Sequence, residues 1–306
     1  MLPAFLTTLL FALSAASAGR TTRMLGSKAA NVARLSLATV WLALWAHTFG
    51  QGWSGPSLAW FVLSGVVGFG LGDLALYAAL PRIGARLTIL LTQCLAAPVG
   101  AIVEWLWLGT GLTPAQVLWG TVILVGVAWA VRPEPTVTTG RAHRVTGTIL
   151  GVIAALGQGG GAVITRKAYA VAQQAGVSID GGTAAYQRIL GGLGLTLVFL
   201  LVYRGVRRWR RPAIQDQGTA RTPRPWARAW PWVLVNSLAG PAIGVACYQW
   251  ALSIAPTGVV LAIVASTPLA IIPFAYLLNG ERPGVPSLIG GLIAVIGAMA
   301  LTLATH

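Results

Sequence analysis

One carboxylate, Asp73, lies within a long apolar run of this 306-residue chain. An ionisable group inside such a run is costly in a bilayer, so it is by default a candidate for function. Asp73 follows three glycines at alternate positions from Gly68, where a helix could bend, and Tyr77 lies one turn further on the same face. We consider two interpretations of Asp73: a site for a proton or a substrate amine, and a structural ion pair with Arg34 or Arg82.

A second carboxylate, Glu104, lies six residues beyond Pro98 and next to Trp105 and close to Trp107. Removal of water favours the protonated form of a carboxyl group, so a buried Glu104 would suit proton coupling. In the alternative interpretation, Glu104 is close enough to the exterior to reach water, and the tryptophans form an interfacial belt. Both interpretations stay open at this stage.

Uncharged polar residues also fall within apolar runs. Gln93 and Gln158 lie near the middle of two of them, and Gln158 precedes three glycines that would let a ligand approach the backbone. Tyr248, Gln249 and Trp250 follow one another in a third run. Such residues either line a cavity or form hydrogen bonds between neighbouring helices.

Signatures of catalysis are absent from the sequence. It contains no GxSxG, HExxH or Walker lysine motif and no carboxylate cluster for a metal. Its two cysteines, Cys94 and Cys247, fall in separate apolar runs, so neither a disulfide nor a metal site is indicated. We therefore predict no catalytic residue, no metal and no cofactor, and the lack of a nucleotide motif argues against an ATP-driven pump.

The elements that carry these residues must lie in a membrane. The chain is 56% hydrophobic and 9% charged, whereas soluble domains carry about 25% charged residues. A soluble fold cannot bury so much apolar surface, so the excess must face lipid. The net charge of +15 does not indicate nucleic-acid binding, because the arginines and lysines fall in short gaps between apolar runs.

Ten apolar runs approach the roughly 20 residues that a transmembrane helix needs. They lie near 2–19, 31–48, 58–80, 87–108, 114–131, 146–166, 183–204, 230–252, 257–279 and 286–304. The first run ends in Ala16-Ser17-Ala18, which imitates a signal-peptide cleavage site, but no Lys or Arg precedes it. We therefore expect a retained first span.

The ten runs form two sets of five that resemble each other. A shift of 171 positions places Phe61-Val62-Leu63 on Trp232-Val233-Leu234 and Tyr77 on Tyr248. We therefore predict two repeats, residues 1–135 and 136–306. Because each repeat has an odd number of spans, the second enters the membrane inverted, as in many transporters. Arg34 and Arg188 each lie near the start of the second span of their repeat.

The distribution of positive residues predicts the orientation, because Lys and Arg concentrate in cytoplasmic loops. With the N-terminus outside, only Arg166, Lys167 and Arg188 of the chain's 21 Lys and Arg lie on the exterior side, which leaves 18 inside. We therefore expect both termini to be periplasmic or exterior, the 204–229 loop to be cytoplasmic, and the location to be a bacterial inner membrane.

The sequence resembles the drug/metabolite transporter superfamily, in its EamA-domain branch. The resemblance rests on Gly72-Asp73-Leu74-Ala75-Leu76-Tyr77-Ala78-Ala79-Leu80, on Arg82-Ile83-Gly84-Ala85-Arg86, and on the stretch from Tyr248 to Asn279-Gly280-Glu281-Arg282. The acidic residue that the family carries after the fourth span of each repeat is present as Glu281, whereas Thr110 stands at that place in the first repeat. The resemblance implies an all-α basket of ten helices, with the first, third and fourth helices of each repeat around a central cavity.

The leading hypothesis is a secondary transporter of a small organic metabolite, such as an amino acid or related compound. Its partners would be that solute and the lipid bilayer, and protons coupled through Asp73 or Glu104 are a further hypothesis. Two alternatives remain, a flippase for a lipid-linked sugar and a membrane scaffold that transports nothing.

Overall fold

The computed structural model describes residues 2–108, 113–130, 140–210, 225–254, 263–280, 282 and 284–304. Within these ranges the chain is helical and contains no strand. The helices are α1 (Leu2–Leu25), α2 (Ser27–Thr48), α3 (Leu58–Gly65), η1 (Val66–Gly72), α4 (Asp73–Leu108), α5 (Pro114–Ala130), α6 (Arg141–Gln174), α7 (Gly181–Arg210), α8 (Trp226–Ser237), η3 (Leu238–Ala242), α9 (Ile243–Ile254), α11 (Thr267–Asn279) and α12 (Val285–Leu303).

Among the described residues, six helical runs are long and apolar enough to cross a membrane, and three shorter apolar helices accompany them. The longest run, Leu58–Trp107, has 50 residues, or about 75 Å at the helical rise, which exceeds the roughly 30 Å of a bilayer core. It breaks at Gly84, whose φ of 76° no helix can accommodate. This break falls in the gap between the predicted runs 58–80 and 87–108, and the structure confirms an all-α membrane fold. The count of ten spans stays a prediction.

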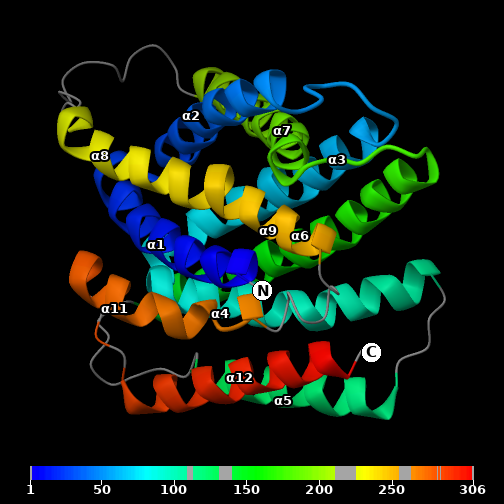
Figure 1. Ribbon diagram of the computed structural model, residues 1–306. Coiled ribbons are helices and arrows are strands. Elements are labelled where there is room, and N and C mark those ends of the chain that lie inside the picture. Colours follow the sequence, from blue (N-terminus) through cyan, green and yellow to red (C-terminus); the bar gives the residue numbers. More distant parts are fainter. Residues whose placement is uncertain are drawn as a thin grey trace.

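The helices pack as a bundle with one separate pair at its edge (Figure 1). The helix α1 packs against α8, α9, α11 and α4, whereas α5 and α12 lie side by side. Small residues permit the close approach of that pair, since a Cβ on Gly290 would lie 2.5 Å from the Ala130 nitrogen and 2.7 Å from the Gly126 oxygen.

Two π-helical segments interrupt α-helical runs at positions that the sequence shift relates to each other. The segment η1 joins α3 to α4, and η3 joins α8 to α9. The 171-residue shift that aligns the apolar runs carries 66–72 onto 237–243, which overlaps η3. The glycines of η1 are consistent with its irregular backbone. In η3, Pro241 lacks an N–H donor, which removes one regular helical hydrogen bond. Single π-helical turns occur frequently at functional sites.

Glycines also bring η1 into direct contact with α6. A Cβ on Gly157 would lie 2.6 Å from the Gly72 Cα, and one on Gly161 would lie 3.2 Å from the Gly68 Cα. Much of the glycine content of these segments is therefore required for backbone-to-backbone packing. This packing holds η1, and with it Asp73 at the start of α4, against α6.

Candidate functional site

An ion pair lies inside the bundle between the second and third helical runs. Arg34 on α2 donates to the Asp73 carboxylate at the start of α4, and their side chains are 7% and 14% exposed. The Arg34 Nε also donates to Asn31 Oδ1 at 3.2 Å. Arg82, the other partner considered for Asp73, donates instead to the Ala78 carbonyl. The pairing therefore joins Asp73 to Arg34.

Two hydrogen bonds and a cation–π contact connect this ion pair to α1 and α8. The Asn236 amide donates to the Tyr77 hydroxyl at 2.6 Å, and the Ser14 hydroxyl donates to Asn236 Oδ1 at 2.8 Å. The Arg34 guanidinium lies 4.7 Å from the centre of the Tyr77 ring, within the range of a cation–π interaction. All four side chains are buried, so one polar network links α1, α2, α4 and α8.

A second buried arginine, Arg188 on α7, lies beside this network. Its guanidinium is 5.3 Å from the Phe69 ring centre, and it interacts electrostatically with Asp73, Tyr169 and Tyr248. Only 6% of Arg188 is exposed, and its Nε is buried without a hydrogen-bond partner. The site thus combines two arginines and one aspartate among the described residues.

The two arginines contact the two π-helical segments in the same way. A Cβ on Gly240 in η3 would lie 3.3 Å from a terminal nitrogen of Arg34. A Cβ on Gly68 in η1 would likewise lie 3.3 Å from a terminal nitrogen of Arg188. Each arginine of one half of the chain therefore lies against a glycine of the other half.

The other predicted polar residues differ in placement. Gln249 is fully buried, and both polar atoms of its amide lack a partner among the described residues. Tyr248 is buried, while Gln93 and Gln158 are half-buried. Trp250 is 48% exposed and lies on the outside of the bundle. Of these residues, Tyr248 interacts with Arg188.

The acidic residues Glu104 and Glu281 cannot be placed in the site. The Glu104 side chain and the whole of Glu281 lie outside the described part of the structure. The roles suggested for them stay predictions.

Sequence reasoning missed Asn236 and Ser14 and assigned the two arginines to structural roles. Asn236 is an amide within an apolar run, so the argument that selected Gln93 and Gln158 would also have found it. Ser14 carries no such signal, because a serine in a membrane helix commonly bonds to its own backbone. The arginines come from α2 and α7, which are second helices of the halves and were not expected to line a cavity.

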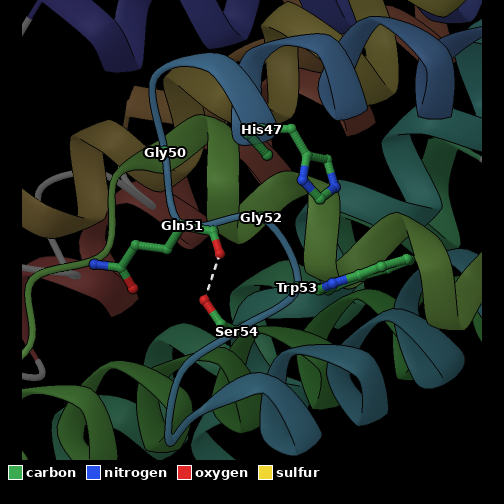
Figure 2. A pocket seen from close by; sticks show the side chains of 7 residues that line it. His47, Gly50, Gln51, Gly52, Trp53 and Ser54 are labelled. Carbon is green, nitrogen blue, oxygen red and sulfur yellow. Dashed lines mark hydrogen bonds between the residues drawn. The ribbon is translucent and has the colours of Figure 1, made fainter.

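A pocket of about 380 Å³ lies at the end of α2, in the loop that leads to α3 (Figure 2). The rings of His47 and Trp53 lie 5.5 Å apart, and the Ser54 hydroxyl donates to the Gln51 carbonyl at 2.6 Å. Gln187 on α7 donates to two carbonyls of this loop at 3.1 and 3.0 Å. The pocket is lined by Ala46, His47, Gly50, Gln51, Gly52, Trp53 and Ser54. None of the polar residues that surround Asp73 lines it.

Asp180 connects α2 to the beginning of α7 near this pocket. Its carboxylate accepts hydrogen bonds from Trp45 Nε1 at 2.9 Å, from the Gly182 and Thr183 backbone N–H groups at 2.9 and 3.0 Å, and from the Thr183 hydroxyl. Partial burial raises the pKa of Asp180, but these hydrogen bonds outweigh burial and hold the pKa below its ordinary value. Asp180 therefore acts as a charged N-cap of α7.

Comparisons with known proteins place the chain in a family. A solved crystal structure is similar to it, with a TM-score of 0.63 and 16% sequence identity over 99% of this chain and 96% of that one, which shows a common fold. No curated protein sequence matches it. Residues 145–303, more than half of the chain, match the EamA-like transporter family. The chain belongs to the EamA-like transporter family and is a membrane transporter of the drug/metabolite type.

Proposed function

We propose that the protein is a secondary transporter that moves a small organic metabolite, such as an amino acid or related compound. Residues 1–135 and 136–306 would form two inverted halves that alternate access to a site between them. The observation that carries this proposal is the buried cluster of Arg34, Asp73 and Arg188, which draws on helices of both halves. Buried charges of this kind mark substrate or ion pathways in membrane proteins.

The burial of the cluster supports a polar solute over a lipid-linked sugar. A lipid-linked substrate needs polar residues along a face open to the bilayer, whereas Arg34 and Arg188 are each 6% exposed. A membrane scaffold has no need for charged groups at this depth, where each charge is costly. The transporter proposal accounts for them.

The orientation follows from the charges of the loops. We propose a bacterial inner-membrane location with both termini outside and the 204–229 loop in the cytoplasm. Reporter fusions test this directly: alkaline phosphatase at the C-terminus should be active, and a fluorescent protein inserted in the 204–229 loop should fluoresce. A loop insertion that does not fluoresce, together with an inactive C-terminal phosphatase, would show that the orientation is the opposite one.

The proposal includes proton coupling through Asp73 or Glu104. Asp73 forms an ion pair with Arg34, and the side chain of Glu104 lies outside the described residues. Glu104→Gln should abolish the dependence of uptake on a pH gradient in proteoliposomes while leaving exchange intact. An unchanged dependence on the gradient removes Glu104 from this role.

A thermal-shift screen of the purified protein against a metabolite library tests the function. A ligand that binds the folded state raises its apparent stability. Hits among amino acids or related solutes support the transporter. Stabilisation by polyprenyl lipids alone would favour the flippase, and the absence of any stabilising solute at two pH values would favour the scaffold.

A further inference from the structure

Arg188 is a buried cation that forms no hydrogen bond to the described residues, and its Nε is fully buried. An arginine side chain carries five N–H donors in a planar fork. Arg188 is 6% exposed, and no described residue accepts a hydrogen bond from it. Its described neighbours are the Phe69 ring, the Gly68 backbone and groups that it reaches only electrostatically. A buried arginine is normally paired, because an unpaired charge away from water is unfavourable.

Arg34, which lies like Arg188 near the start of the second predicted span of its half, has hydrogen-bond partners. Arg34 donates to the Asp73 carboxylate and to Asn31. The 171-residue shift that aligns Tyr77 with Tyr248 places Asp73 on Gly244, which has no side chain. The second half therefore supplies no carboxylate at the place where the first half supplies Asp73.

The space beside Gly244 is already filled by the protein. A Cβ on Gly244 would lie 3.0 Å from the Phe11 ring, and the Gly244 carbonyl accepts a bond from the Thr7 hydroxyl at 3.4 Å. The missing carboxylate of Arg188 therefore has to come from elsewhere. Asp73 is the other candidate, but its hydrogen bond goes to Arg34.

The net charge of the cluster indicates the charge of the ligand that Arg188 lacks. Arg34, Arg188 and Asp73 leave one excess positive charge among the described buried groups. One singly charged carboxylate neutralises it, whereas a phosphate dianion would reverse its sign. The two oxygens of a carboxylate also lie in one plane and match the arginine fork, which binds them through two parallel hydrogen bonds. A substrate amine would have no free carboxylate here, since Asp73 is occupied by Arg34.

Two buried polar side chains without hydrogen-bond partners among the described residues, one that interacts with Arg188 and one next in sequence to such a residue, are available for the rest of such a ligand. The Tyr169 hydroxyl on α6 is buried without a partner and interacts electrostatically with Arg188. Gln249 follows Tyr248, another neighbour of Arg188, and both polar atoms of its amide are buried without partners. An amide offers both donors and acceptors.

We propose that Arg188 binds the carboxylate of the transported solute, so that the substrates are small monocarboxylates that need no amino group. This inference rests on the proposed transport function and specifies its substrate class. The Phe69 ring centre lies 5.3 Å from the guanidinium, within the range of a cation–π interaction that restricts the movement of the fork.

Binding to the purified full-length protein in mild detergent tests the inference. The probes are matched sets at constant ionic strength: lactate and lactamide, and 3-phenylpropionate, 3-phenylpropionamide and 3-phenylpropylamine. We expect at least one carboxylate to raise the melting temperature and its uncharged or amine counterpart to have no effect. Stabilisation by the amine or amide, by inorganic phosphate to the same extent, or by none of the carboxylates would overturn the inference.

Two variants and a control locate the site. Arg188→Gln should weaken carboxylate binding about tenfold to a hundredfold, and Arg188→Lys, which keeps the charge but not the fork, about tenfold. Arg141→Gln removes a charge from an exposed arginine at the start of α6 and should leave binding unchanged. Unchanged affinity in a folded Arg188→Gln protein would overturn the assignment. The probe series on the unaltered protein still decides the substrate class if neither variant folds.

The failure of this inference can be separated from the failure of the proposed function. If an amine or a neutral solute binds and is exchanged across proteoliposomes, the transport proposal stands and the Arg188 site is wrong. If a carboxylate binds through Arg188 but is not exchanged, the site is right and the transport proposal is wrong.

Discussion

Arg34 on α2 and Arg188 on α7 are both buried in the bundle and differ in their partners. Arg34 is paired with Asp73, whereas Arg188 makes no hydrogen bond to the residues that the structure describes. Each guanidinium also lies against a glycine of the opposite half of the chain, Gly240 for Arg34 and Gly68 for Arg188. A movement of one half against the other would therefore change the surroundings of both arginines at once.

Removal of one partner of the Arg34–Asp73 ion pair should lower the unfolding free energy. In Asp73→Asn the Arg34 charge stays buried without its carboxylate, so we expect a loss of about 3–5 kcal/mol in unfolding free energy. Thermal denaturation of the purified variant measures this loss. The double variant Arg34→Gln/Asp73→Asn should lose less than the two single variants together. Strict additivity would mean that the pair makes no energetic contribution.

The Tyr77 hydroxyl should matter for stability, since it accepts the bond from Asn236 inside the bundle. Tyr77→Phe leaves the Asn236 amide without this acceptor, and we expect a loss of about 1–3 kcal/mol. Tyr276→Phe is the matched control, because Tyr276 is 50% exposed. Equal melting temperatures for both variants would show that the network through Asn236 is not formed.

The contact of α5 with α12 should not tolerate an added methyl group. Gly290→Ala places a Cβ 2.5 Å from the Ala130 nitrogen, so backbone has to move and we expect a loss of about 1–3 kcal/mol. Gly120→Ala is the control on α5, since nothing lies within 4 Å of its Cβ position. That variant should be neutral or slightly stabilising. A neutral Gly290→Ala would contradict the close pairing of these helices.

The Asp180 cap should produce a defined pH dependence. Asp180→Ala removes the N-cap of α7 and should cost about 1 kcal/mol, whereas Asp180→Asn still accepts the backbone hydrogen bonds and should cost less. The folded pKa of Asp180 lies below its ordinary value, so its contribution is present above about pH 4 and is lost as the pH falls through the folded pKa.

Melting curves of the three proteins between pH 3 and pH 7 check this expectation. The difference between the natural protein and Asp180→Ala should be constant at the upper end of this range and should narrow at the lower end. If the difference in melting temperature between these two proteins widened as the pH falls, Asp180 would not be stabilised in its charged form.

The sequence was sufficient to predict the fold class and much of the helix layout. Where the structure describes them, the apolar runs lie on helices, because a span needs about the same number of apolar residues in any helical membrane protein. The first part of the run 257–279 lies outside the described residues. The break before the fourth run was also predictable, since Pro81 and Gly84 both disfavour a continuous helix there. Asp73 pairs with Arg34, one of the two arginines considered as its partner, but this contact does not decide between a structural and a functional role.

The rotation of each helix about its axis could not be predicted. A run that is apolar on all sides has no polar face to show which residues point inward, so Gln249 and Trp250 looked alike in the sequence. The structure buries Gln249 and exposes Trp250. The partners of the buried groups also depend on long-range contacts, such as those of Ser14 with Asn236, which no local pattern records.

Counterflow in proteoliposomes tests the proposed transport most directly. Vesicles that contain the purified protein are loaded with an unlabelled solute that stabilises it and are then diluted into a trace of the same solute in labelled form. Alternating access predicts a transient accumulation of label that requires the internal solute and is absent from protein-free vesicles. Label uptake no greater than in protein-free vesicles, for a solute that binds the purified protein, would contradict the proposal.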